Sequence, residues 1–214
     1  MTAPPAAAPL LIACALGIEH LALRTGGRAD GAGGPVTLLR TGMGPKAAEQ
    51  AVTRGLGVPE LRQAAVMATG FCAGLAPGMR PGDLVVAEEA RDPRGSTPCD
   101  GTDVLAEALT RAVPRRTVHV GPLIGSDHIV RGAERAELLA TGAIATDMES
   151  AATLHSAVRS GPRPVAAVRV IVDAPEHELV RIGTVRGGIS AFRVLRSALP
   201  AFFDWHRSLL LPRR

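Results

Sequence analysis

Two short segments constrain the fold of this chain most strongly, because each reads as a buried strand that ends in a carboxylate. The first segment runs from Ile144 into Asp147 and Glu149. The second segment covers residues 165–172 and ends in Asp173. Acidic groups at the carboxyl ends of strands in an α/β sheet lie where such folds bind their ligands. The two segments therefore predict an α/β sheet with a ligand site at that edge.

Strand-like runs alternate with helical runs along the chain, which predicts an α/β fold with a mostly parallel or mixed sheet. The expected strands cover residues 10–16, 36–41, 64–69, 83–87, 117–124, 144–146 and 165–172. The expected helices cover residues 45–56, 103–112, 131–139, 148–158 and 184–207. Residues 92–100 read as a loop. We expect residues 1–9 to form a flexible tip and residues 10–214 to form a single domain.

The length and the composition fit one soluble domain. A chain of 214 residues is long enough to bury a sizeable core. Aromatic residues make up only 2%, so we expect that core to be aliphatic. The apolar runs stay below the ~18 residues that a membrane span needs, and the start lacks the basic residues of a signal peptide. We therefore expect a cytoplasmic protein.

Several kinds of site are disfavoured by the residue pattern. The three cysteines show no CxxC spacing and the six histidines are dispersed, so we expect neither a disulfide scaffold nor a metal site. The arginines behind the net charge of +4 are scattered, with few aromatic residues between them, which argues against a nucleic-acid groove. A weak affinity for anionic surfaces, and thus a peripheral membrane contact, stays open. We expect no cofactor.

Two loops rich in small residues follow strands. The first contains Gly42 and Gly44 and opens a helix, where free N–H groups suit an anion, a ribose or a bound water. Its spacing also matches a dinucleotide fingerprint, but the next strand lacks the ribose-binding acid that such a site requires. The second loop begins at Gly70 and Phe71. A purely structural turn is the alternative for both loops.

The acids divide into candidates for function and candidates for helix capping. Glu19 ends the first strand and could be a capping or solvated residue. Asp147 fits a helix N-cap, whereas apolar neighbours draw Glu149 inward. For Asp173 we favour a functional role, and His128 reads as a hydrogen-bonded loop residue. Two acids at strand ends suit cleavage of a bond to a sugar carbon, one holding the sugar and one protonating the leaving group.

Taken together, these segments resemble the nucleoside phosphorylase/nucleosidase superfamily, which includes methylthioadenosine/S-adenosylhomocysteine nucleosidases. Five motifs appear in the family's order and span nearly the whole chain: Ala15 to Glu19, Gly42 to Gly44, Thr69 to Pro77 with Gly82-Asp83, Met148 to Ala152, and Arg169 to Asp173. The resemblance implies a three-layer phosphorylase-like fold, with a mixed central sheet flanked by helices. It also implies a homo-oligomer.

The resemblance assigns roles to the matching residues. Asp173 would be the general acid that protonates the purine at N7, and Glu19 would activate the attacking water. Glu149 would bind the ribose 2′ and 3′ hydroxyls. Around the substrate, Met148 would pack against the sugar, Ile129 would line the base, Gly70 and Phe71 would contact the nucleoside, and Gly42 and Gly44 would form the phosphate or water loop.

The chain also departs from the family pattern. Ala68 and Phe71 stand where phosphorylases place phosphate-binding side chains, which favours hydrolysis over phosphorolysis. Phosphate stays an alternative acceptor, with Lys46 or a partner subunit's arginine as its ligand. Val172 replaces the serine that precedes the final aspartate in the nucleosidases. The hydrogen bonds that orient Asp173 are therefore expected to differ.

The motifs look most like the hopanoid-associated branch, which is linked to removal of adenine from adenosylhopane. The alternatives are a methylthioadenosine/S-adenosylhomocysteine or futalosine nucleosidase, a phosphate-dependent purine nucleoside phosphorylase, and a non-catalytic nucleoside-binding protein. Apolar residues that could line a large 5′ site, or only pack the last helix, are Ala174, Pro175, Leu179, Val180, Ile182, Phe192, Phe202 and Phe203.

Overall fold

The structure is a computed structural model that describes residues 8–26, 33–175 and 184–210. Its strands are β1 (Leu10–Cys14), β2 (Val36–Arg40), β3 (Ala65–Gly74), β4 (Leu84–Asp92), β5 (Gly95–Pro98), β6 (Val118–Gly125), β7 (Ala145–Asp147) and β8 (Val165–Asp173). Its helices are α1 (Gly17–Thr25), α2 (Pro45–Leu56), the short 3₁₀ helix η2 (Pro59–Leu61), α3 (Thr102–Ala112), α4 (Ala133–Ala140), α5 (Ser150–Arg159) and α6 (Thr184–Ser208).

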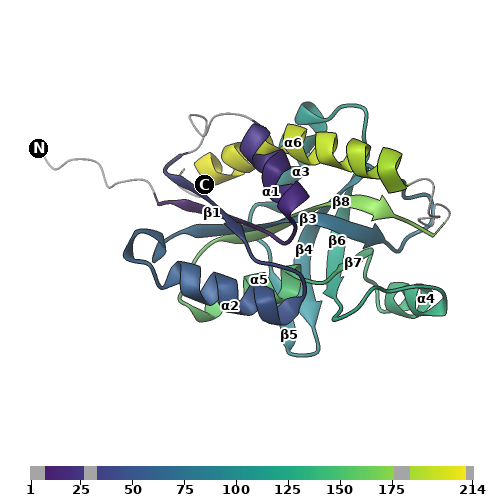
Figure 1. The fold of residues 1–214 in the computed structure, drawn as a ribbon, viewed down its shortest axis with the longest axis horizontal. Helices are drawn as coiled ribbons and strands as arrows, with labels where there is room; N and C mark the ends of the chain where they lie inside the picture. The colour runs from purple at the N-terminus through teal and green to yellow at the C-terminus, as the bar shows by residue number, and fades with distance from the viewer. Residues whose placement is uncertain (1–7, 27–32, 176–183, 211–214) are drawn as a thin grey trace, which may run out of the picture.

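The strands form one mixed sheet in the order β2-β1-β3-β7-β6-β4-β5, and β8 pairs with both β3 and β4. The pairs β1–β2, β1–β3, β3–β8, β4–β6 and β6–β7 are parallel, whereas β3–β7, β4–β5 and β4–β8 are antiparallel. The sheet is flanked by helices (Figure 1). The expected mixed α/β architecture is thus confirmed.

Both faces of the central strands are buried, as expected where helices cover a sheet on two sides. In β1, Leu10 and Ile12 face a core that α1, α3 and α6 close, whereas Leu11 and Ala13 face a second core beneath α2 and α5. Figure 1 shows α1, α3 and α6 on one side of the sheet and α2 and α5 on the other. Phe202 and Phe203 are buried in the first core, so these two pack the last helix instead of lining a 5′ site.

Most predicted elements lie close to their predicted places, and three differ. The loop predicted to begin at Gly70 and Phe71 is wrong, because β3 continues through both residues to Gly74 while it pairs with β8. We did not predict α1, because the apolar run of the first strand continues through Leu16 and hides the helix start. The predicted loop over residues 92–100 contains β5, a short strand in which only Thr97 is buried. Its pairing with β4, and not its own composition, makes it a strand.

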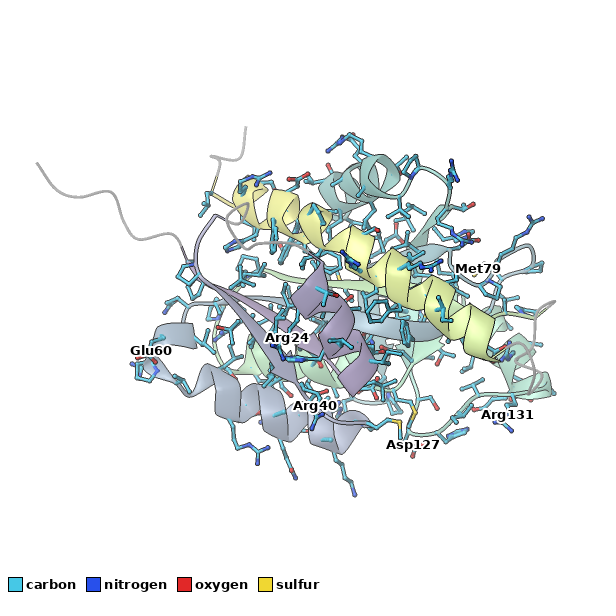
Figure 2. The ribbon with its side chains drawn as sticks, turned by 45° about the horizontal axis from the view of Figure 1, so that its top comes forward. Arg24, Arg40, Glu60, Met79, Asp127 and Arg131 are labelled. Carbon is cyan, nitrogen blue, oxygen red and sulfur yellow. The ribbon has the colours of Figure 1, made fainter. Side chains whose placement is uncertain are left out.

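The carboxyl ends of β3 and β8 point toward the same end of the molecule, where α4 also lies (Figure 1). In Figure 2 Arg131, just before α4, lies at the right-hand edge, and Glu60 of η2 lies at the left-hand edge. The described helices include none that is long and apolar enough to cross a membrane. The single domain over residues 10–214 and the flexible tip over residues 1–9 stay predictions, and residues 1–7 lie outside the described part.

Candidate functional site

Glu19 lies in the first turn of α1 and is buried. Its carboxylate accepts hydrogen bonds from the backbone N–H groups of Ala15 (2.9 Å) and Leu16 (2.8 Å), and from that of Phe71 on β3 (2.8 Å). Burial raises the pKa of the Glu19 carboxyl, while the charge of Arg169 and the backbone donors oppose that shift. Glu19 therefore caps its own helix and also joins that helix to β3.

Glu149 connects the loop before α2 to the end of β7. Its carboxylate accepts a hydrogen bond from the backbone N–H of Gly44 at 2.8 Å, across 105 residues of sequence. Gly44 has a φ of +89°, a conformation that favours glycine, and it precedes Pro45 at the start of α2. Burial raises the pKa of the Glu149 carboxyl, and Arg169 opposes that shift. The N–H of Gly44 thus donates to the carboxylate of Glu149.

Arg169 is the buried cation that holds these acids together. Its guanidinium forms a short ion pair with Asp147 and donates to the Ser150 hydroxyl at 2.8 Å and to the Thr69 carbonyl at 3.0 Å. Glu149 and Glu19 also raise the pKa of Arg169 through their charge, although burial works in the opposite direction. Arg169 therefore compensates the negative charge of three buried carboxylates.

His128 lies in a hydrogen-bonded loop, as the sequence favoured, whereas the N-cap residue of α5 is Glu149 and not Asp147. Both carboxylate oxygens of Asp147 accept a hydrogen bond from the backbone N–H of Ser150, the first residue of α5, at 3.2 and 3.1 Å. His128 is exposed and contacts Asp127 at 2.7 Å and Glu134 at 3.1 Å. These contacts raise the pKa of the His128 imidazole, with Asp127 as the main cause. Asp147 and His128 also line the cavity described below.

Asp173 ends β8 and forms a short ion pair with Arg135 of α4. The Arg135 side chain is only 6% exposed and that of Asp173 15% exposed. Val172, the residue before Asp173, has no polar side chain that could orient the carboxylate. The guanidinium of Arg135 contacts that carboxylate.

A cavity of about 290 Å³ lies where these groups meet. This volume is near the lower end for small-molecule sites. The predicted residues that line it are Glu19, Phe71, Ile129, Met148, Glu149 and Asp173. The other three predicted residues, Gly42, Gly44 and Gly70, are absent from its wall: Gly44 reaches it through Glu149, and Gly70 lies behind Glu19. Within the described residues, no three His, Cys, Asp or Glu side chains converge as metal ligands.

Sequence reasoning missed two arginines of this site. Arg169 was visible as the first residue of a family motif and as a charge within an apolar strand, but no role was assigned to it. Arg135 carries no comparable signal, because it lies in a short helix between Glu134 and Ala136-Glu137 and reads as a solvent-facing residue. The structure shows it as a buried residue of α4.

Gly70→Ala is expected to displace the side chains of Glu19 and Arg169. Gly70 has a φ of +136°, and an added Cβ would lie 2.5 Å from a Glu19 carboxylate oxygen and 2.6 Å from an Arg169 nitrogen. We expect a loss of ~1–3 kcal/mol in the free energy of unfolding, measured by urea titration. We expect a larger loss in the free energy of binding of a small molecule in the cavity beside Glu19, measured by calorimetry. Gly78→Ala is the matched control, since its φ is +80° but its Cβ would meet open space. Equal effects of the two substitutions would contradict the close packing.

Solved structures with the same fold are enzymes of nucleoside metabolism. The 5′-methylthioadenosine/S-adenosylhomocysteine nucleosidase from Neisseria meningitidis superposes with a TM-score of 0.74 at 20% identity, covering 92% of this chain and 98% of that chain. Futalosine hydrolase of Helicobacter pylori superposes with a TM-score of 0.75 at 15% identity, covering 92% and 98%. A methylthioadenosine/S-adenosylhomocysteine nucleosidase from Colwellia psychrerythraea, in complex with adenine, superposes with a TM-score of 0.71 at 17% identity, covering 91% and 96%.

A search among curated protein sequences found no match. The family model described as the phosphorylase superfamily matches residues 23–199, which span both acidic strand ends and most of the sheet. A dinucleotide-binding fold is therefore not supported. This chain belongs to the phosphorylase superfamily.

Proposed function

We propose that this protein is a nucleosidase that hydrolyses the N-glycosidic bond of an adenine nucleoside. The observation that carries the proposal is the meeting of Glu19, Glu149 and Asp173 at one cavity of about 290 Å³. Glycosidic cleavage passes through an oxocarbenium-like state, which needs a proton on the leaving group and negative charge near the sugar. The three acids could meet both needs, and a protein that only binds nucleosides would need no such set.

Each acid has a distinct part in the proposed reaction. Asp173 gives a proton to N7 of the purine as the electron pair of the glycosidic bond moves to the base. Glu149 accepts hydrogen bonds from the ribose hydroxyls, and Met148 packs against the sugar. Glu19 takes a proton from the attacking water, and the raised pKa of its buried carboxyl suits a general base. Ile129 and Phe71 border the base, and both line the cavity.

The structural neighbours support this class of substrate. They include nucleosidases acting on methylthioadenosine and S-adenosylhomocysteine, one of them in complex with adenine, and a futalosine hydrolase. Methylthioadenosine, S-adenosylhomocysteine and futalosine are therefore the alternative substrates. All of these proteins are below 25% identical to this chain, so the likeness supports the reaction class through the fold and not the choice of substrate.

Water is the proposed acceptor. The side chain of Ala68 is buried within β3, and Phe71 presents an aromatic ring to the cavity where a phosphorylase would need a phosphate ligand. Lys46 is exposed and lines neighbouring surface cavities instead of this one. Phosphorolysis stays the alternative, with an arginine from a partner subunit as the phosphate ligand.

We place the substrate in the adenosylhopane class, a nucleoside with a large apolar 5′ group. The motif resemblance to the hopanoid-associated branch supports this placement. A second cavity of about 770 Å³ shares Met148 and His128 with the first, which gives room for a group larger than a nucleoside. Of the apolar residues proposed for a 5′ site, Leu179, Val180 and Ile182 lie outside the described residues.

We further propose a homo-oligomer in the cytoplasm. Met43 and Ile129 line the cavity and are 68% and 65% exposed, so the cavity mouth carries large apolar side chains that a second subunit could cover. A peripheral contact with an anionic membrane is compatible with the net charge of +4.

Glu149→Gln is expected to reduce the preference for ribosides over 2′-deoxyribosides. The neutral amide loses the charge-assisted hydrogen bonds to the sugar, each of which contributes roughly 1.5–3 kcal/mol. The measurement compares kcat/KM for adenosine derivatives with and without the 2′ hydroxyl. Glu60→Gln, an exposed change in η2, is the control. A wild-type enzyme that treats both sugars alike would contradict the role of Glu149.

A further inference from the structure

The hydrogen-bonding capacity of the buried arginine of α4 is only partly satisfied within the described residues. Arg135 is 5% exposed, and it is the one buried residue of α4, a helix that the structure describes from end to end. Its Nη2 donates to the Asp173 carboxylate in a short ion pair. Within the described part of the chain, its Nε and Nη1 are buried without a hydrogen-bond partner.

This arrangement is costly for folding alone. A buried cation needs its donors satisfied, and burying polar groups without partners is unfavourable. Arg169, the other buried arginine of the site, has hydrogen bonds to Ser150 and Thr69 besides its ion pair. The one carboxylate that Arg135 contacts ends β8 at the cavity wall, so a role through Asp173 accounts for its burial.

We propose that Arg135 is a positioning residue for Asp173, which rests on the function proposed above. A carboxylate oxygen that is held by a guanidinium cannot rotate freely, so the ion pair fixes the plane of the acid. Val172 offers no side-chain donor for this purpose, and Arg135 supplies one from α4.

The ion pair with Arg135 also stabilises the negative charge that Asp173 carries after it has given up its proton. When the proton moves from Asp173 to N7, the glycosidic electron pair moves to the base, and water adds to C1′ as it gives a proton to Glu19. Asp173 is then an anion. A guanidinium already aimed at that anion stabilises the transition state in which its charge develops. The other charged or titratable groups that line the same cavity are Glu19, Cys72, His128, Asp147 and Glu149, and none of the carboxylates can compensate an anion.

The test uses two substrates that differ in their need for a proton. Methylthioadenosine leaves as adenine and requires protonation, whereas p-nitrophenyl β-D-ribofuranoside releases a stable phenolate. Arg135→Gln is expected to lower kcat for methylthioadenosine about 10- to 100-fold, the loss of one charge-assisted hydrogen bond. We expect kcat for the phenyl riboside to change less than about 3-fold. Losses of equal size on both substrates would overturn the proposal, because a purely structural role affects both alike.

Three further variants complete the design. Arg131→Gln removes an exposed arginine next to α4 and should leave both rates unchanged. Asp173→Asn combined with Arg135→Gln should be no slower than Asp173→Asn alone, and additive losses would overturn the proposal. If Arg135→Gln does not fold, Arg135→Lys replaces it, because lysine keeps the charge and loses the fork geometry. Its loss must again be selective for methylthioadenosine.

Adenine binding separates this proposal from the proposed function. Calorimetry with free adenine needs no turnover. If the wild type binds adenine but cleaves no nucleoside, the proposed function fails. Weaker adenine binding by Arg135→Gln, with unchanged binding by Arg131→Gln, would still support the positioning role. Where the wild type cleaves no nucleoside, unchanged adenine binding by Arg135→Gln, or no adenine binding by the wild type, would overturn it.

Discussion

Asp173→Asn is expected to lower kcat for adenine release by ~10²–10⁴-fold, the usual contribution of general acid catalysis. The amide keeps the shape of the side chain and removes the proton donor. Adenine release, followed by chromatography at saturating substrate, measures the effect. Asp103→Asn, on the exposed face of α3, is the matched control. Turnover near that of the wild type would rule out Asp173 as the general acid.

The same substitution should also reduce stability. The sequence alone gives no reason to expect this, whereas the ion pair with Arg135 does. Removing one partner of a buried ion pair leaves an uncompensated charge and costs ~3–5 kcal/mol. We expect a loss near the lower end, because the amide oxygen of asparagine still accepts a hydrogen bond. Urea unfolding of Asp173→Asn and Asp103→Asn measures the difference.

Arg169→Met is expected to be among the most destabilising single changes in the chain. It leaves Asp147 without its ion-pair partner and removes the positive charge beside Glu19 and Glu149. Breaking such a buried pair costs ~3–5 kcal/mol, a large part of the ~5–15 kcal/mol that stabilises a domain. Arg115→Met, an exposed change after α3, is the control. Equal urea midpoints for the two variants would contradict the claim that Arg169 stabilises the fold through its buried ion pair.

The stability loss of Arg169→Met should grow with pH. Burial raises the pKa of Glu19 and Glu149 in the folded state, so the folded protein binds more protons than the unfolded chain above the ordinary glutamate pKa. Stability therefore falls as pH rises through that range. Arg169 opposes the shifts, and its removal raises both pKa values further. Unfolding midpoints measured at pH 5 and pH 8 should differ more for Arg169→Met than for the wild type.

The fold could largely be predicted from the sequence where local signals agree with tertiary packing. The helix from Pro45 to Leu56 was placed to the residue, because a glycine loop and a proline mark its start. The strands of the two cores are long apolar runs, and few other secondary structures fit them. By contrast, α1 begins directly after such a run, which hides its start, and β5 is a strand only because it pairs with β4.

Part of the candidate site could be predicted because its acids lie next to the ends of predicted strands. Glu19 follows β1 and Asp173 ends β8, and both strands run parallel to β3, so their strand ends meet at one edge. Glu149 follows β7, which runs antiparallel to β3, so this argument does not place it. What escaped prediction depends on distant contacts. Gly44 and Glu149 are bonded across 105 residues, and nothing local marks that pair. Arg135 reads as exposed in the sequence, because nothing local marks its ion pair with Asp173 at the end of β8.

The central claim is tested most directly by assaying adenine release from a panel of adenosine derivatives, with and without phosphate. The panel runs from methylthioadenosine through 5′-alkyl adenosines of increasing chain length. We expect adenine and free ribose products in phosphate-free buffer, with kcat/KM rising along the series by up to ~0.8 kcal/mol of binding per buried methylene. Flat or falling kcat/KM would favour the methylthioadenosine alternative. No adenine from any member, or release only with phosphate and a ribose 1-phosphate product, would contradict the account.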